Sequence, residues 1–278
     1  MLSSPSYGEL NNKPSADSPY TEVGKWHVAI GFGVGQKTNP LFGGDDIPLY
    51  LVPSIYYYGE HFYFDDGTFG YSFVQHEALV ISAISALNTH GANFYRWHPN
   101  NIFVANQYFD MALANEELSE SGPNRLIDIS RLSKRKWSLD AGLQFNYYLD
   151  DSVMIQGRAL YDISNIHQGK SAQLMLEKAF KQERLSIKLN AGIDWLDSNL
   201  VNYYYGISAK DDLSSNNHYH TGAVTNPFIG INTSYALTPQ WHAALTYRHQ
   251  KFGHGIANSP IVAESVSRTY FIGFYYVF

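Results

Sequence analysis

The sequence predicts an all-β protein, a transmembrane antiparallel up-and-down β-barrel with about twelve strands, ten being the alternative, and with both termini in the periplasm. Three observations predict this fold. Segments of about 9 to 12 residues alternate apolar and polar side chains, which is the length that a tilted strand needs to cross a bilayer. The links between these segments alternate between short and long. The last segment is an aromatic strand that ends at the final residue.

The last segment, residues 269–278, has alternate residues from Tyr270 to Phe278 on one face, all of them large and apolar. A free strand edge of this kind promotes aggregation, and closure into a barrel removes it. The ending Gly273-x-x-Tyr276-x-Phe278 also resembles the signal that the barrel-assembly machinery recognises, with Phe271 where a polar residue is usual. We therefore expect that machinery to be a partner.

The composition agrees with a barrel and excludes other classes. The 278 residues include 22 Tyr, 16 Phe and 5 Trp, enough for aromatic girdles at both membrane interfaces. A mean hydropathy of −0.26 is too polar for a helical membrane protein. The absence of cysteine excludes disulfides and thiolate metal sites. The net charge of −6, with a basic run only at 134–136, argues against nucleic acid, and this run is interpreted as the charged shoulder of a strand.

Residues 1–24 are rich in Ser, Pro and Asn and are expected to form a flexible periplasmic segment before the barrel at 25–278. The first residues have no apolar core of a signal peptide. A protein of the outer membrane of a Gram-negative bacterium needs such a signal, so we expect it to have been removed from this sequence.

The first predicted strand, residues 26–35, directs Trp26, Phe32 and Val34 to the lipid and small residues to the lumen. Four further strands are expected at 49–58, 60–65, 68–73 and 77–88. The later strands are expected at 137–148, 153–162, 171–180, 185–196, 228–236, 241–248 and 269–278.

The lengths of the links between the predicted strands are a second, independent indication of a barrel. Those on the periplasmic side are short, at 59, 75–76, 149–152, 181–183 and 238–239. Those on the outer side include the long 89–134, 206–225 and 253–267, together with the shorter 66–67 and 164–170. The strands around the turn at 66–67 are too short to span unaided, and with this hairpin outside the wall the barrel would have ten strands.

Several motifs resemble one family, the MipA/OmpV outer-membrane proteins. The segment Asn202-Tyr203-Tyr204-Tyr205-Gly206 is similar to the family's most specific motif, and Ser259-Pro260 to another that precedes the last strand. Further similar segments are 39–46, 53–62 and 162–169, so the resemblance covers most of residues 26–278. The loop at 89–130 is longer than the family pattern.

The resemblance implies function more loosely than fold. The family's name-giving member is a scaffold between a lytic transglycosylase and a penicillin-binding protein, whereas other members are porin-like proteins or adhesins. No catalytic residue, cofactor or metal comes with the family. We therefore expect a non-enzymatic scaffold in contact with lipopolysaccharide. A narrow channel for small solutes or ions is the first alternative, and a surface adhesin that uses loop 89–134 is the second.

Six charged residues are predicted to face the lumen: Asp140, Arg158, Asp162, Lys188, Asp194 and Arg248. They could line a solute path, but in so small a barrel we expect opposite charges to pair and fill the interior. Other polar groups are weaker candidates. The acidic pairs fit turns, and the histidines at 218 and 220 supply too few zinc ligands.

The tyrosine motif at 203–206 is expected where a strand leaves the membrane, in the outer aromatic belt. There it would serve either as part of the girdle or in recognition. Because the loop at 253–267 lies on the same side, we expect the motif to contact Ser259 and Pro260.

Overall fold

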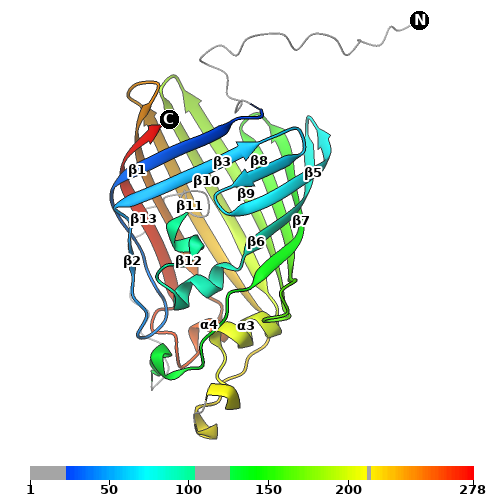
Figure 1. Ribbon diagram of the computed structural model, residues 1–278, viewed down its shortest axis with the longest axis vertical. Helices are drawn as coiled ribbons and strands as arrows, with labels where there is room; N and C mark the ends of the chain where they lie inside the picture. The colour runs from blue at the N-terminus through cyan, green and yellow to red at the C-terminus, as the bar shows by residue number, and fades with distance from the viewer. Residues whose placement is uncertain (1–22, 104–125, 212–213) are drawn as a thin grey trace, which may run out of the picture.

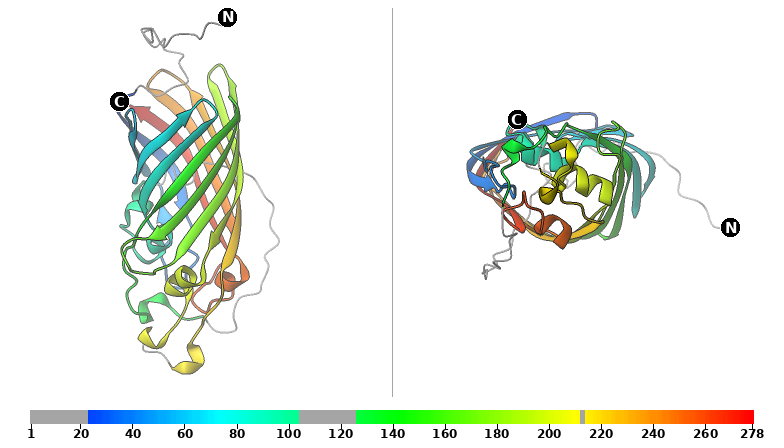
Figure 2. Two further views of the ribbon diagram at one scale, coloured as in Figure 1. Left: turned by 90° about the vertical axis from the view of Figure 1, so that its right-hand side faces the viewer. Right: turned by 90° about the horizontal axis from the view of Figure 1, so that it is seen from below.

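The barrel wall is closed by its first and last strands. The computed structural model describes residues 23–103, 126–211 and 214–278. β1 (Trp26–Lys37) pairs with β13 (Val266–Val277) from Ala29 opposite Val277 to Lys37 opposite Thr269. The predicted aromatic strand therefore has a hydrogen-bonded neighbour on each side and no free edge (Figures 1 and 2).

Ten more strands complete a wall of twelve, all antiparallel. They are β3 (Leu51–Tyr58), β4 (Phe62–Asp65), β5 (Thr68–His76), β6 (Leu79–Leu87), β7 (Leu139–Asp150), β8 (Val153–Asp162), β9 (Lys170–Gln182), β10 (Leu185–Leu196), β11 (Val224–Ala236) and β12 (Trp241–Lys251). A two-residue strand, β2 (Ile47–Pro48), pairs with the end of β1. The predicted twelve-stranded barrel is confirmed.

The short hairpin β4–β5 belongs to the wall, so the ten-stranded alternative is wrong. β4 pairs with β3 on one side and with β5 on the other, and β5 continues to β6. Its turn has Asp66 and Gly67 at positive φ, 40° and 97°, as tight hairpins need. The Asp66 carboxylate accepts the Ile55 N–H at 2.6 Å, which fixes the tip to β3.

Side chains alternate across the wall as predicted. In β1, Phe32 and Val34 are 46% and 62% exposed on the outer face, whereas Gly31 and Gly35 are buried on the inner face. A Cβ at Gly31 would lie 2.6 Å from the ring of Tyr275, so glycine is required for that ring to lie against the inner wall. Small inner residues here make room for aromatic rings.

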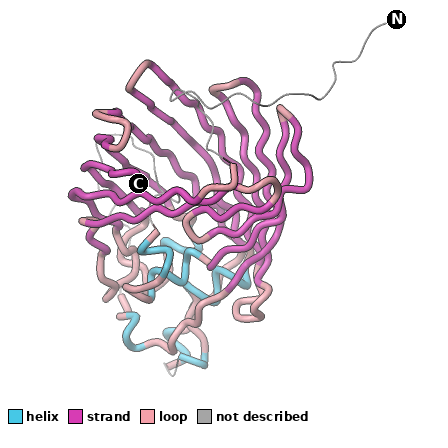
Figure 3. The backbone as a smooth tube through the Cα atoms, turned by 45° about the horizontal axis from the view of Figure 1, so that its top comes forward, coloured by secondary structure: helices cyan, strands magenta, loops and turns pink. Residues whose placement is uncertain are grey.

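The two ends of the barrel differ. The turns at 59–61, 77–78, 151–152, 183–184 and 237–240 lie at the end where β1 begins and β13 ends, and the longer links lie at the opposite end. Within the described parts of these longer links there are seven short helices (Figures 1 and 3): η1 (Thr89–Phe94), α1 (Pro99–Ile102), η2 (Ile129–Arg131), α3 (Ser198–Tyr205), η3 (Ala209–Asp211), η4 (Ser215–Asn217) and α4 (His254–Ala257). None of the helices in the described residues has the length and apolar character needed to cross a membrane.

Two expectations lie largely outside the described residues. The segment 1–24 is described only at its last two residues, and the centre of the loop 89–134 falls within 104–125. The described parts of that loop, 89–103 and 126–134, pack over the barrel end.

Candidate functional site

The long links fold together into a loop cap, which we define as residues 38–50, 88–103, 126–138, 163–169, 197–211, 214–223 and 252–265. Its helices lie within the ring of strands when the barrel is seen from that end (Figure 2, right). The cap has a hydrophobic core, to which the strand ends contribute Leu196 of β10 and Val224 of β11. Its other members are the cap residues Leu41, Ile127, Leu132, Leu200, Val201, Tyr204, Tyr205, Ile207, Phe252, Ile256, Ile261 and Val262. The loops are therefore a packed layer over the lumen.

The tyrosine motif is at the centre of this core, on helix α3, so the prediction that it ends a strand in the aromatic belt is wrong. Asp197 caps the helix by accepting the Leu200 N–H at 2.9 Å. Buried residues then recur at 200, 201, 204 and 205, the spacing of one helical face. Tyr204 and Tyr205 are fully buried. The N-cap and this spacing were the sequence signals for a helix.

The three tyrosine hydroxyls join α3 to the link between β6 and β7. The bonds are from the Lys136 N–H to Tyr203 Oη at 2.7 Å, between Tyr204 Oη and Ser138 Oγ at 2.9 Å, and between Tyr205 Oη and His90 Nδ1 at 2.8 Å. Each aromatic side chain therefore fills the core and also satisfies a polar group of a neighbouring loop.

The other motif residues hold further loops. Asn202 donates to the Thr221 carbonyl and accepts the Thr221 N–H, both at 2.8 Å. Gly206 accepts a hydrogen bond from Arg135 through its carbonyl at 3.0 Å. The family motif 202–206 thus makes contacts within the cap through each of its residues.

The structure brings the tyrosine motif and the Ser259-Pro260 loop together. Ser259 is fully buried, and its Oγ donates to the Tyr205 carbonyl at 2.6 Å. The Pro260 carbonyl accepts the Ile127 N–H at 2.7 Å. This arrangement is that of loop packing, and a role in recognition stays a prediction.

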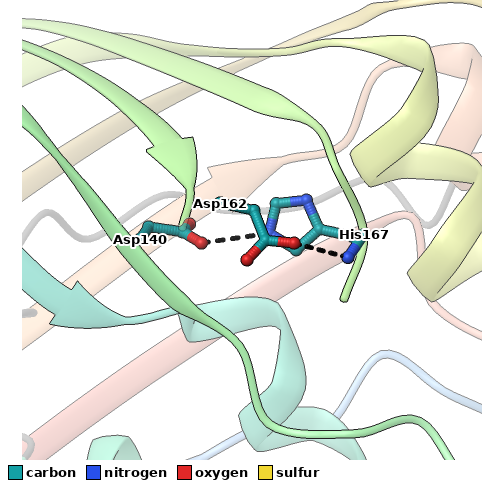
Figure 4. A group of neighbouring side chains, drawn as sticks. All are labelled: Asp140, Asp162 and His167. Carbon is teal, nitrogen blue, oxygen red and sulfur yellow. Dashed lines mark hydrogen bonds and ion pairs between the residues drawn. The ribbon is translucent and has the colours of Figure 1, made fainter. Parts of the chain in front are cut away.

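Asp140 and Asp162, expected in the lumen, lie opposite each other on β7 and β8 where the wall meets the cap (Figure 4). His167 Nε2 lies 3.0 Å from Asp140 Oδ1, and Asn88 donates to Asp140 Oδ2 at 2.6 Å. The Asp162 carboxylate accepts backbone N–H groups of Ser164, Ile166, His167 and Gln168 at 2.6 to 2.9 Å. The two carboxylates organise the link between β8 and β9.

The donor atoms of Asp140, Asp162 and His167 lie within 4.8 Å of one another, a set that a metal ion can use. However, His167 Nδ1 accepts the Gly169 N–H at 3.0 Å. The neutral ring must then carry its proton on Nε2, where it points at Asp140 and leaves no lone pair for a metal. The hydrogen bonds therefore favour a structural network over a metal centre.

The remaining predicted lumen charges line a cavity of about 720 Å³. Arg248 Nη2 lies 3.4 Å from Asp194, and Lys188 Nζ lies 3.4 Å from Glu177. Arg158 Nε donates to Gln144 at 2.6 Å. Opposite charges thus pair across strands as expected, but the cavity shows that the side chains do not fill the interior.

Of the assembly signal, Tyr276 and Phe278 lie at the short-turn end and Gly273 lies within β13. Gly273 pairs with Gly33 and with Ala244, and the ring of Tyr276 stacks edge-on against Trp241 at 5.0 Å between centroids. Phe278 is 73% exposed. Recognition of these residues by the assembly machinery stays a prediction.

The cap is expected to loosen in acid because of two of its histidines, the buried His98 and the partly buried His90. Burial and the nearby Lys37 lower the pKa of His98 to about 4, and burial lowers the pKa of His90 to about 4 as well. In the unfolded segment the histidines take up protons below about pH 6.5, whereas in the folded cap they stay neutral to a lower pH. Their contribution to the stability of the cap is therefore complete above about pH 6.5. This stabilisation is expected to fall as the pH decreases from about 6.5 to about 4, measured as hydrogen-exchange protection factors of residues 89–103.

His98→Asn is the matched control. The His98 side chain accepts the Asn100 N–H at the start of α1, and asparagine is also a good N-cap but does not titrate. The variant should show a weaker loss of protection in acid than the wild type. An identical pH profile would contradict the role of His98.

The chain is similar to known outer-membrane proteins. The sequence profile described as "MltA-interacting protein MipA" matches residues 9–278. Outer membrane protein OmpV of Vibrio cholerae serotype O1 is 23% identical over 87% of this chain and 82% of its own length. MltA-interacting protein of Escherichia coli K12 is 24% identical over 85% of this chain and 84% of its own. Among solved structures, the NanC porin covers 91% of this chain and 98% of its own, with 6% identity and a TM-score of 0.43.

Proposed function

The chain belongs to the MltA-interacting protein MipA family of outer-membrane barrels, and from this premise we propose that it is a non-enzymatic scaffold for enzymes that cut and synthesise murein. The outer membrane is its location, as it is for the relatives named outer membrane proteins. The proposed scaffold function goes beyond the family and the location, and it is supported by the arrangement of the loop cap.

The observation that carries the proposal is the packed core of the cap over one end of the lumen. Leu200, Val201, Tyr204 and Tyr205 have no exposed surface at its centre. A diffusing solute needs an open path, whereas a buried apolar layer must be disrupted to let one through. A barrel closed in this way is better suited to act through binding at its surface.

The relative named MltA-interacting protein suggests the class of partner. We infer that the partner is a lytic transglycosylase, with a penicillin-binding protein as a second one. Such enzymes act on murein in the periplasm, so they would meet the short-turn end. The turns there are as short as two residues, at 77–78 and 151–152. Residues 1–22, which precede β1 at that end, are therefore the proposed handle.

Removal of the handle is expected to abolish partner capture. The experiment expresses the full chain behind an export signal, cross-links living cells and identifies the captured proteins by mass spectrometry. With the intact chain, a lytic transglycosylase should be enriched about tenfold or more over the background. A loss of about 1.4 kcal/mol of binding free energy on deletion is enough to lower the affinity by that factor. Deletion of residues 2–22 should bring it to background.

A scrambled version of residues 2–22 is the control, because it keeps length and charge but not sequence. Capture that survives both the deletion and the scramble would refute the handle. Capture of assembly machinery alone, with no murein enzyme, would refute the scaffold.

The polar cavity favours a second candidate, a narrow channel. Arg158, Lys188 and Arg248 line about 720 Å³ of lumen beneath the cap. If the cap moved aside, these charges would face passing ions and set their selectivity. Steady conductance of the wild type in a planar bilayer, with ion selectivity changed by Arg158→Glu, would favour this candidate over the scaffold.

A further inference from the structure

The fold divides the basic run at 134–136, which lies just before β7. Arg135 is buried and makes an ion pair with Asp211 at 2.7 Å. Lys134 and Lys136 on either side are exposed. Arg135 therefore has a structural role, whereas the two exposed lysines are accessible to a ligand.

A second segment packs beside this run. The Tyr95 hydroxyl donates to the Arg135 carbonyl, and the rings of Tyr95 and His98 lie 6.1 and 4.8 Å from the ring of Trp137. The two residues between them, Arg96 and Trp97, are exposed, Trp97 by 78%. Arg96 and Trp97 thus lie between two residues, Tyr95 and His98, that both contact the segment containing the lysines.

The two described segments of the β6–β7 link, residues 88–103 and 126–138, carry more basic than acidic residues, although the chain carries −6 overall. Within residues 88–103 and 126–138 the exposed charged residues are Arg96, Arg131, Lys134 and Lys136. The acidic residue of these two segments is Asp128, whose carboxylate accepts the Ser130 N–H at 2.7 Å. The surface is therefore suited to an anionic ligand.

The position of the patch indicates which kind of anion. Trp137 is 44% exposed and lies two residues before Leu139, the first residue of β7, whose outward residues Leu139, Leu143 and Phe145 are exposed on the lipid-facing wall. Tryptophan is enriched where the hydrocarbon ends and the headgroups begin. The basic residues belong to the link between β6 and β7 at the end of the barrel with the long loops, which places them next to the membrane surface.

We propose that Arg96, Lys134 and Lys136, with Trp97 and Trp137, bind the phosphorylated lipid A part of lipopolysaccharide. The guanidinium and ammonium groups form charge-assisted hydrogen bonds to phosphate oxygens. The two indole rings lie against the sugar and the start of the acyl chains. Long loops of outer-membrane barrels face outward, where this lipid is the anionic one. The inference rests on the location of the barrel and not on the scaffold.

The test uses the full chain in detergent and native mass spectrometry with three probes: bisphosphorylated lipid A, its monophosphorylated form and phosphatidylglycerol. Bisphosphorylated lipid A is expected to bind about tenfold or more tightly than phosphatidylglycerol, because several exposed charge contacts each add a fewfold. The triple variant Arg96→Gln, Lys134→Gln, Lys136→Gln should lose about that factor. The monophosphorylated form should fall between.

The matched control is Lys181→Gln with Arg184→Gln, which removes two exposed basic residues from the short-turn end. It should bind lipid A as the wild type does, and unchanged heat-modifiable migration on gels should show that both variants are folded. The proposal is overturned if the triple variant keeps wild-type affinity. It is also overturned if phosphatidylglycerol binds equally well, or if the control variant loses as much affinity.

Discussion

Tyr204→Ala is expected to open the loop cap while the wall of the barrel stays closed. Tyr204 is fully buried, its ring meets Tyr203 edge-on at 4.9 Å between centroids, and its hydroxyl bonds to Ser138. Removing a large buried ring costs about 3 to 5 kcal/mol, since contacts are lost and a cavity is left. Much of the cap is held by such contacts between loops and not by strand ladders, so most of the loss should appear as cap opening.

The measurement is the rate at which proteinase K cleaves the cap of the folded protein in detergent. When opening and closing are fast, cleavage follows the population of the open form, so the rate should rise about 10²- to 10³-fold. Tyr204→Phe is the control, because it keeps the ring and loses one hydrogen bond worth about 1 kcal/mol. If Tyr204→Ala resists the protease as the wild type does, the cap does not depend on its core.

Arg135→Gln is expected to release the described end of the β6–β7 link from the cap. The side chains of Arg135 and Asp211 are 8% and 1% exposed, and Arg135 Nη2 also donates to the Gly206 carbonyl. Burial alone raises the pKa of Asp211, but the hydrogen bonds from Arg135 and from the Ser208 N–H outweigh it and lower that pKa overall. Removal of one member of such a buried pair costs about 3 to 5 kcal/mol, since the other charge is left without its partner.

A double-mutant cycle separates the pair from other effects. Arg135→Gln, Asp211→Asn and the combination are compared by hydrogen exchange at residues 126–138 and 207–211. The double variant should be less damaged than the sum of the two single variants, which gives a coupling energy above about 1 kcal/mol. Additive effects would show that the ion pair does not hold these loops together. Lys134 and Lys136 are unchanged in all three variants.

The wall could be predicted because its rule is local. Alternation with period two places side chains in or out, and short links between long strands set neighbours. Phe32 and Gly31, for example, face opposite sides as expected. The alternation of inward and outward residues does not say how far along the barrel axis a residue lies, however. Asp140 was correctly directed inward, but only the fold places it under the cap, against Asn88 and His167.

The cap could not be predicted in the same way, because its core joins residues far apart in sequence. Leu41, Ile127 and Val262 meet in one cluster although they come from three different links. Helix α3 was missed for a different reason. Its three adjacent tyrosines were interpreted as a membrane girdle, while the cap at Asp197 and the buried face at 200, 201, 204 and 205 indicated a helix.

The pairing of β1 with β13 has a consequence for how the chain reaches its fold. Most wall contacts join strands that are adjacent in sequence, and these can form one hairpin at a time. The pair of Ala29 with Val277 joins opposite ends of the chain, so its loop-closure entropy is overcome only after the rest of the sheet has brought the ends together. We expect this seam to form last, and substitutions that weaken it to slow maturation more than they alter the finished barrel.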